Sequence, residues 1–171
     1  MKLNFACGGS RWPGFINSDI NGEPGVEHGD LNEFPYPYED DSAEIVMISH
    51  GLFHTRNGDP VIADHAAVMR EFHRILAPGG WLRIDDNPLR CYLDGEDVDA
   101  GEVDAELARG YPHHLRMSRQ DLRDIILRDA GFARFHYVPT DMTYIPGDHE
   151  TLDAIIGNRM GHVSFTVEAQ K

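Results

Sequence analysis

Short apolar runs divide the chain into segments of strand length. The run Ala43–Ser49 is almost continuously apolar, which is typical of a central strand in a parallel sheet. The remaining runs are bounded by glycine, proline or polar residues, as expected for strands. They predict strands at Leu3–Cys7, Phe15–Ile20, Val26–His28, Trp81–Ile84, Phe132–Val138 and Val163–Ala169.

Two other segments repeat apolar residues every three or four positions, which predicts helices with one buried face. For the first helix we expect Asp59 as the cap and Pro60 in the first turn, with Pro78-Gly79-Gly80 ending it. Its expected buried face is Val61, Ile62, Val68, Met69, Phe72, Ile75 and Leu76.

The second helix is expected after Ser118 and Asp121, which resemble a capping box. Leu122, Ile125 and Ile126 provide its apolar face, and Gly131 stands where a C-cap requires a positive φ.

Strands and helices in this order predict an α/β fold. Only Gly8–Gly14 separates the first two strands, whereas a parallel crossover usually contains a helix. Seven extended residues span roughly 23 Å, about enough to return along a short strand. We therefore expect the first helix to be reduced to a turn.

Composition narrows the class of protein. The 171 residues contain no apolar run of the ~20 residues that span a bilayer, and neither Cys7 nor Cys91 has metal-ligand spacing. A strand-like N-terminus without a leader predicts a cytoplasmic protein with no membrane partner. The net charge of −14 argues against duplex nucleic acid as a partner. The absence of repeats and linkers predicts one domain over residues 1–171.

Candidate ligand-binding residues follow the first three strands, and ligands of open parallel sheets bind at the carboxyl ends of strands. The turn Ala6-Cys7-Gly8-Gly9 offers small residues and backbone N–H groups. Asp19 is suited to ribose hydroxyls, and Asp30-Leu31 to the edge and face of a base. Each acid taken alone also fits an ordinary turn or cap.

These residues form part of an ordered set of motifs. The set begins with L-N-F-A-C-G-G at Leu3–Gly9 and P-G-F-I-N-S-D at Pro13–Asp19. It continues through Asp30-Leu31, Phe34-Pro35-Tyr36, Asp41–Val46, S-H-G-L-F-H at Ser49–His54, Glu71–Ile84, Leu122–Phe132 and Ser164–Lys171. Together they resemble a compact, type 11-like group of class I S-adenosylmethionine-dependent methyltransferases. The resemblance covers nearly all of the chain except about 85–117.

The resemblance implies a Rossmann-like, mostly parallel sheet of about six to seven strands, with helices on both faces and an antiparallel last strand. It implies S-adenosylmethionine as cofactor, with the methionine part over the glycine turn, the ribose on Asp19 and the adenine beside Asp30. The sulfonium is expected beside Ser49 and His50. The implied cofactor-binding residues are Phe5, Ala6, Cys7, Gly8, Gly9, Asp19, Asp30, Leu31, Ser49 and His50. Two residues depart from the family pattern, since Phe53 replaces a Glu and Ala6 replaces a Gly.

Two residues are candidates for catalysis. His50 is the candidate base, because a histidine titrates near neutral pH; a packing role is the alternative. Asp85 follows the next strand with Asp86, and either carboxylate could accept a hydrogen bond from the methyl acceptor or simply cap the strand end.

The acceptor site is expected mainly in the poorly matching segment 85–117, with His54, Asp86, His113 and His114 as substrate contacts. For the two adjacent histidines the alternatives are surface exposure or a metal site. We predict no metal, because their spacing is not diagnostic. Acidic residues between 94 and 106 would attract a cationic acceptor or form a solvated loop.

The predicted function is methyl transfer to an oxygen or nitrogen atom of a small-molecule or carrier-bound acceptor, with a homodimer as a possible assembly. The main alternative is a module that binds S-adenosylmethionine or a nucleotide without catalysis. A dinucleotide-dependent oxidoreductase fits less well, because Asp19 follows the glycine turn much sooner than the ~20 residues that fold requires.

Overall fold

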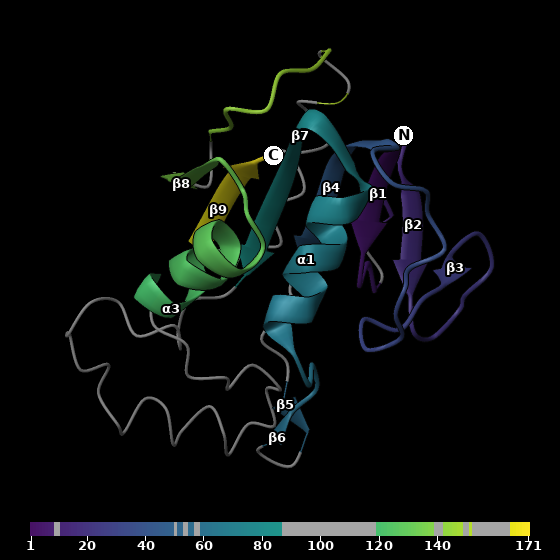
Figure 1. Ribbon diagram of the computed structural model, residues 1–171. Helices are drawn as coiled ribbons and strands as arrows, with labels where there is room; N and C mark the ends of the chain where they lie inside the picture. The colour runs from purple at the N-terminus through teal and green to yellow at the C-terminus, as the bar shows by residue number, and fades with distance from the viewer. Residues whose placement is uncertain are drawn as a thin grey trace.

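A computed structural model describes residues 1–8, 11–49, 51–52, 55–56, 59–86, 119–138, 142–148, 151 and 165–171. Seven strands form one sheet in the order β3-β2-β1-β4-β7-β9-β8 (Figure 1). They are β1 Lys2–Phe5, β2 Ile16–Asp19, β3 Glu27–His28, β4 Ala43–Ser49, β7 Leu76–Asp86, β8 Arg134–Val138 and β9 Phe165–Gln170. β5 (Thr55–Arg56) and β6 (Asp59–Pro60) form a separate antiparallel pair.

The five strands from β3 to β7 are parallel, and β9 runs antiparallel to both β7 and β8. This arrangement confirms the expected Rossmann-like sheet with an antiparallel last strand. The observed bounds of β4 are those predicted. Six of its seven residues are apolar or small and five are buried, because strands lie on both sides of it.

Helix α1 runs over His65–Ile75 and begins later than the sequence predicted. Asp64, rather than Asp59, caps it, and its side chain accepts a hydrogen bond of 2.9 Å from the Ala67 N–H. The expected start at Asp59 was wrong because Asp59 and Pro60 pair with β5 instead. Val61, expected on the buried face, is 40% exposed.

The second helical segment consists of α3 (Arg119–Asp124) and a π-helical turn η1 (Ile125–Asp129). Gly131 follows it with φ 86°, which confirms the predicted C-cap. Leu122 and Ile126 are buried in the core that also holds the inner face of α1. Both helical segments therefore cover the same face of the sheet, toward the viewer in Figure 1.

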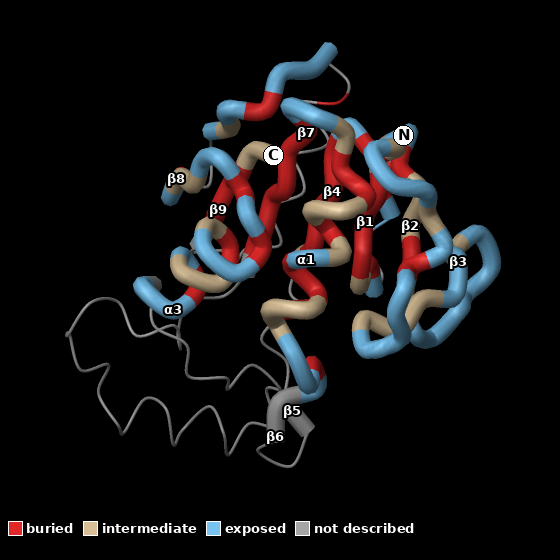
Figure 2. The backbone as a smooth tube through the Cα atoms, in the orientation of Figure 1, coloured by how far each residue is buried: buried red, intermediate tan, exposed pale blue. Residues whose placement is uncertain are grey.

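The strands β1, β4, β7 and β9 hold most of the buried residues of the sheet (Figure 2). Their helix-covered face contributes Leu3, Phe5, Val46, Ile48, Leu82 and Ile84 to the main core. On the opposite face, a smaller apolar cluster consists of Trp12, Phe15, Ile45, Met47, Trp81 and Ile145. The described residues place no helix on that second face.

Irregular segments stand where crossover helices are usual. Residues 20–42 are all described and contain no helix, and β1 joins β2 through turns in the described part of that link, as expected for a reduced first helix. Tyr36 fills the core in place of a helix: its ring packs against Phe5 and Phe72 at centroid distances of 5.2 and 5.9 Å.

Arg74, in the last turn of α1, fixes this irregular segment. Its guanidinium donates to the carbonyls of Tyr36 (3.1 Å) and Tyr38 (2.9 Å) and to the carboxylates of Asp40 (2.6 Å) and Glu71 (2.8 Å). Hydrogen bonds from Arg74 lower the pKa of Glu71, so the pair stays ionised. Hydrogen bonds from one side chain thus tie the irregular segment to the end of α1.

Candidate functional site

The carboxyl ends of β1, β2, β3 and β4 lie at one edge of the sheet, because these strands are parallel neighbours. Four segments lie at these ends: residues 6–8, 19–21, 29–32, and 49 with 51–52. The sequence predicted this grouping for the Gly turn, Asp19, Asp30-Leu31 and Ser49. The structure brings their described residues to the same edge, as the strand ends at the foot of the sheet in Figure 1 show.

The turn after β1 is tied to β2 by two hydrogen bonds. The Cys7 N–H donates to the Ser18 carbonyl (3.1 Å), and the Gly8 N–H donates to Asp19 Oδ2 (2.9 Å). Ala6 and Gly8 have φ values of 51° and 49°, so the chain turns sharply directly after the strand. The two hydrogen bonds therefore fix the turn relative to Asp19 and the end of β2.

Cys7 is buried within this turn. Burial raises the pKa of its thiol, and the negative charge of Asp19 raises it further. The thiol is therefore protonated at neutral pH and serves as a small packing group.

Asp19 has further donors on its second oxygen. Oδ1 accepts hydrogen bonds of 3.0 Å from the Asn21 N–H and from Asn21 Nδ2. A carboxylate has about four acceptor positions, and described residues of the chain use three of them. The remaining capacity, on Oδ2, suits one additional donor such as a hydroxyl.

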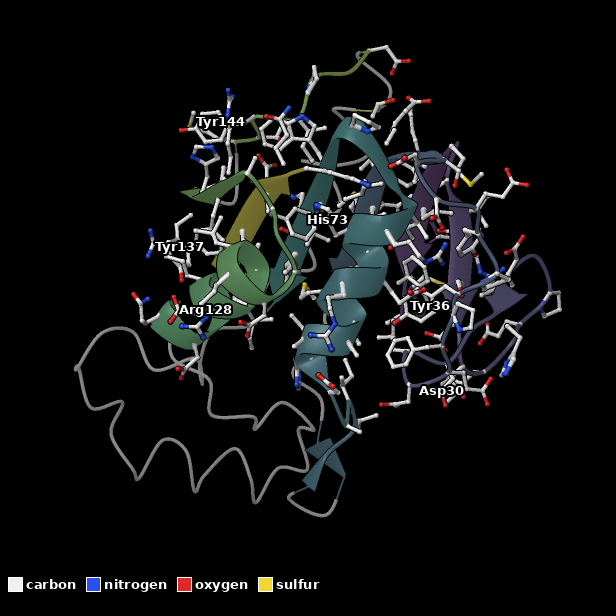
Figure 3. All side chains as sticks on the ribbon, viewed as in Figure 1. Asp30, Tyr36, His73, Arg128, Tyr137 and Tyr144 are labelled. Atoms are coloured by element: carbon white, nitrogen blue, oxygen red, sulfur yellow. The ribbon has the colours of Figure 1, made fainter. Side chains whose placement is uncertain are left out.

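Asp30 lies at the outer end of the same edge, on the β2–β3 side of α1 (Figure 3). Its Oδ1 accepts from the Asn32 N–H (2.8 Å) and from Asn32 Nδ2 (3.1 Å). Asn32 in turn binds the Val61 carbonyl and the Ala63 N–H, which joins this loop to the segment before α1. Asp30 Oδ2 has no hydrogen bond to the residues that the structure describes.

Leu31 is half-buried against the main core, and its carbonyl accepts a hydrogen bond of 2.9 Å from the Tyr36 hydroxyl. Gly29, two residues earlier, donates its N–H to the Asp19 carbonyl (3.1 Å). A Cβ at position 29 would lie 2.2 Å from Ser18 Oγ, so glycine allows the β3 loop to approach β2 closely.

The segment after β4 meets both β1 and α1. A Cβ at Gly51 would lie 2.3 Å from the Cβ of Ala6. The next residue, Leu52, is buried in the main core and its carbonyl accepts from His65 Nε2 at 2.9 Å. Burial lowers the pKa of His65, which keeps this imidazole neutral. Ser49 is half-buried and lies opposite Asp85 in the sheet.

Asp85 lies in a buried polar network on β7 and β9. It accepts hydrogen bonds from Arg83 Nε (2.9 Å) and from the Thr166 hydroxyl (2.7 Å), and it is 6% exposed. Burial raises the pKa of its carboxyl despite the nearby guanidinium. These contacts favour the strand-end structural role over direct contact with an acceptor. Asp86 ends the same strand.

Several predicted site residues lie outside the described residues. They are Gly9, His50, His54, His113 and His114, together with nearly all of the expected acceptor segment 85–117. Their predicted roles stay predictions. The described residues contain no group of His, Cys, Asp and Glu side chains able to hold a metal ion. They also contain no helix with the length and apolar character needed to cross a membrane.

Three residues of this edge were not singled out from the sequence. Ile20 is 53% exposed directly after Asp19 and offers an apolar surface beside the carboxylate. Gly29 and Gly51 permit close approaches between neighbouring segments. The sequence did contain a cue for each residue. Ile20 is an apolar residue at the end of a predicted strand, and the two glycines stand close to Asp30 and Ser49.

Comparison with protein families gives one match over much of the sheet. Residues 14–84 match a family described as "Methyltransferase domain". A curated relative, the ubiquinone/menaquinone biosynthesis C-methyltransferase UbiE of Xanthomonas campestris, is 29% identical over 133 residues, covering 66% of this chain. The chain spans about half the length of that relative, 47%.

Solved structures show the same fold at low sequence identity. A Thermotoga maritima protein described as a possible histamine N-methyltransferase has a TM-score of 0.63 and 18% identity, over 99% of this chain and 81% of its own. A putative methyltransferase from Bacillus halodurans has a TM-score of 0.57 and 20% identity, over 99% and 91% of the two chains.

Proposed function

We propose that the chain is a class I S-adenosylmethionine-dependent methyltransferase and that it transfers a methyl group from S-adenosylmethionine to an oxygen or nitrogen acceptor; the family match over residues 14–84, the curated relative and the shared fold support this proposal. The observation that carries the proposal is the hydrogen bond between the Gly8 N–H and Asp19 Oδ2. It joins the turn expected to hold the methionine part to the carboxylate expected to hold the ribose.

The described residues fit this cofactor. Asp19 Oδ2 retains acceptor capacity for a ribose hydroxyl. Asp30 Oδ2, one strand farther out, suits the exocyclic amine of adenine, and the exposed side chain of Ile20 suits its face. A Cβ at Gly8 would meet no described atom within 4 Å, so the turn after β1 is open to close approach by a ligand.

When bound, S-adenosylmethionine supplies an already activated methyl group, so the protein's main task is alignment. Holding the donor and acceptor atoms in line contributes much of the rate acceleration. In our proposal, Asp19 and Asp30 fix the adenosine end and the β1 turn fixes the other. Ser49 lies beside the reacting group, with His50 as the proposed base for an acceptor that must lose a proton.

For the methyl acceptor we propose a chemical class, a small molecule or a carrier-bound group, and no individual compound. The names of the relatives include a C-methyltransferase and a possible N-methyltransferase, so they do not agree on the acceptor atom. A small-molecule or carrier-bound acceptor is supported by the charge of −14, which disfavours a polyanion. We assign its binding to segment 85–117, where the family resemblance fails.

Calorimetric titration tests the cofactor. We expect S-adenosylmethionine and its demethylated product to bind, and NAD not to bind. Asp19→Ala should weaken both cofactor affinities at least about tenfold, the loss of a charge-assisted hydrogen bond. Glu44→Ala is the matched control, because Glu44 is an exposed carboxylate at the opposite end of the parallel strands.

Binding of NAD alone would overturn the proposal. A screen for transfer of labelled methyl groups into metabolite and protein fractions then tests catalysis. Cofactor binding without transfer to any fraction would favour the alternative, a non-catalytic binding module. In an active protein, His50→Ala should reduce turnover more than cofactor affinity.

A further inference from the structure

We propose that Ala6 and Gly51 form a complementary pair that positions the β1 turn for the methionine end of the cofactor. In this pair, glycine is required at position 51 because alanine occupies position 6. This inference rests on the proposed function, since it concerns the same cofactor site. It makes Gly51 a positioning residue.

The contact lies between the ends of two neighbouring parallel strands. Phe5 of β1 is paired with Ile48 of β4, and Ala6 and Gly51 come shortly after these paired residues. A Cβ built on Gly51 would lie 2.3 Å from Ala6 Cβ, far inside van der Waals contact, whereas Ile48 carbons would be at an ordinary 3.5 Å. Among the residues that the structure describes, the neighbour that excludes a side chain at position 51 is therefore the methyl group of Ala6.

Gly51 does not need to be glycine for its backbone conformation. The left-handed glycines of the described chain are Gly8, Gly14, Gly22, Gly25, Gly79 and Gly131, and Gly51 is not among them. Ala6, in contrast, is left-handed with φ 51°, which is unfavourable for an alanine by about 1 kcal/mol. Gly51 is therefore needed for the space that it leaves to Ala6.

The methyl group of Ala6 cannot move out of the way by rotation, because a Cβ is fixed to the backbone. An added side chain at position 51 would instead displace the turn or the β4 end. The turn is the part proposed to hold the methionine end, so a displacement there acts directly on that end of the cofactor. Asp19 is also held by Asn21 through Oδ1 at 3.0 Å, so its ribose-binding position does not depend on the turn alone. Adenosine contacts on Asp30, held separately by Asn32, would be little affected.

The experiment compares two ligands that share the adenosine part. S-adenosylhomocysteine has the amino acid end of the cofactor, and 5′-methylthioadenosine lacks it. For Gly51→Ala we expect S-adenosylhomocysteine to bind at least about tenfold more weakly, since small misplacements are costly at a positioned site. Methylthioadenosine should bind within about threefold of the unmodified protein.

The exchanged pair Ala6→Gly/Gly51→Ala is the decisive variant. It retains one methyl group in the contact, and we expect it to restore affinity for S-adenosylhomocysteine to within about threefold. Gly80→Ala is the matched control for plain destabilisation, because a Cβ there would lie 2.8 Å from the Ala77 carbonyl oxygen, near the start of β7. It should lower the melting temperature without the ligand-selective loss.

Unchanged affinity in Gly51→Ala, an equal loss for both ligands, or failure of the exchanged pair to restore binding would each overturn the inference. The proposed function fails differently, when the unmodified protein binds neither ligand. The pair is then still tested by melting temperature: Gly51→Ala must lower it and the exchanged pair must restore it. Any other result overturns the pairing.

Discussion

Arg83 on β7 and Glu168 on β9 form a buried ion pair with a distance of 2.7 Å between Nη1 and Oε1. Glu168 also accepts from the Thr143 hydroxyl (2.5 Å) and the Tyr144 N–H (2.6 Å), and Arg83 donates to the Met142 carbonyl (3.1 Å). The pair therefore attaches segment 142–148 to the sheet. With Asp85 included, one guanidinium compensates two carboxylates.

Replacing Arg83 with methionine should be strongly destabilising. The substitution leaves the buried carboxylates of Asp85 and Glu168 without their cation, which costs about 3–5 kcal/mol in the free energy of unfolding. Urea unfolding followed by circular dichroism measures this loss. Arg128→Met is the control, since the Arg128 side chain is 71% exposed, and no measurable change is expected. A small effect at Arg83 would contradict a structural role for the network.

Arg74→Met should release the irregular segment that replaces a crossover helix. It removes donors to two carbonyls and two carboxylates, and we expect a loss of about 1–3 kcal/mol in unfolding free energy. Arg70→Met, one turn earlier on α1 and more exposed, should stay within about 0.5 kcal/mol. If urea titrations give the same change in unfolding free energy for both substitutions, the hydrogen bonds of Arg74 do not stabilise the irregular segment.

His65 should make stability depend on pH. Burial lowers its pKa in the folded protein below the ordinary 6.5, so between these two values the unfolded chain binds more protons. The stabilisation is complete above pH 6.5 and decreases as the pH falls toward the lowered value. Burial lowers the pKa of His73 too, so both histidines act in the same direction.

Comparison of His65→Gln with the unmodified protein isolates this effect. The difference in unfolding free energy between them should shrink as the pH is lowered from about 7.5 to 5.5, because the glutamine does not titrate. Urea titrations at five or six pH values measure it. A difference that is constant across the range would exclude a role for His65 protonation.

Gly29→Ala should lower the free energy of unfolding only slightly, although the added Cβ would overlap with Ser18 Oγ. The added Cβ would lie 2.2 Å from Ser18 Oγ, but a hydroxyl can rotate about χ1, and Ser18 Cβ would be at 3.6 Å. We expect the free energy of unfolding to fall by about 1 kcal/mol, as measured by thermal or urea unfolding. Adding Ser18→Ala should recover most of that loss; a double variant less stable than Gly29→Ala would show that backbone strain, rather than the hydroxyl, is limiting.

Local sequence patterns predicted the sheet well and the helix boundaries less well. The run of β4 is almost continuously apolar, so its bounds were predictable from the local pattern of apolar residues alone. The start of α1 was not, because Asp59-Pro60 and Asp64 are both good helix starts and the pairing of β6 with β5 decides between them. That pairing involves residues outside the helical pattern.

The candidate site was predictable where it depends on order along the chain. Asp19 and Asp30 follow short strands, and a parallel sheet must bring such ends to one edge. The contact of Ala6 with Gly51 was not predictable, because the two residues are far apart in sequence and a glycine does not reveal whether it is needed for conformation or for space. The buried network was also missed, since Glu168 and Arg83 meet only across β7 and β9.

The position of β9 has a consequence for how the molecule folds. This strand is the last in sequence, yet it lies between β7 and β8, and β8 has no other strand partner in the described sheet. Trp81 pairs with Gln170, so the contact closes a long loop of chain, and loop closure of this kind is slow relative to local structure. In the described sheet, β8 can therefore join only after β9 has paired with β7. Until then, the edge of β7 that β9 later covers is unpaired and open to pairing with other chains.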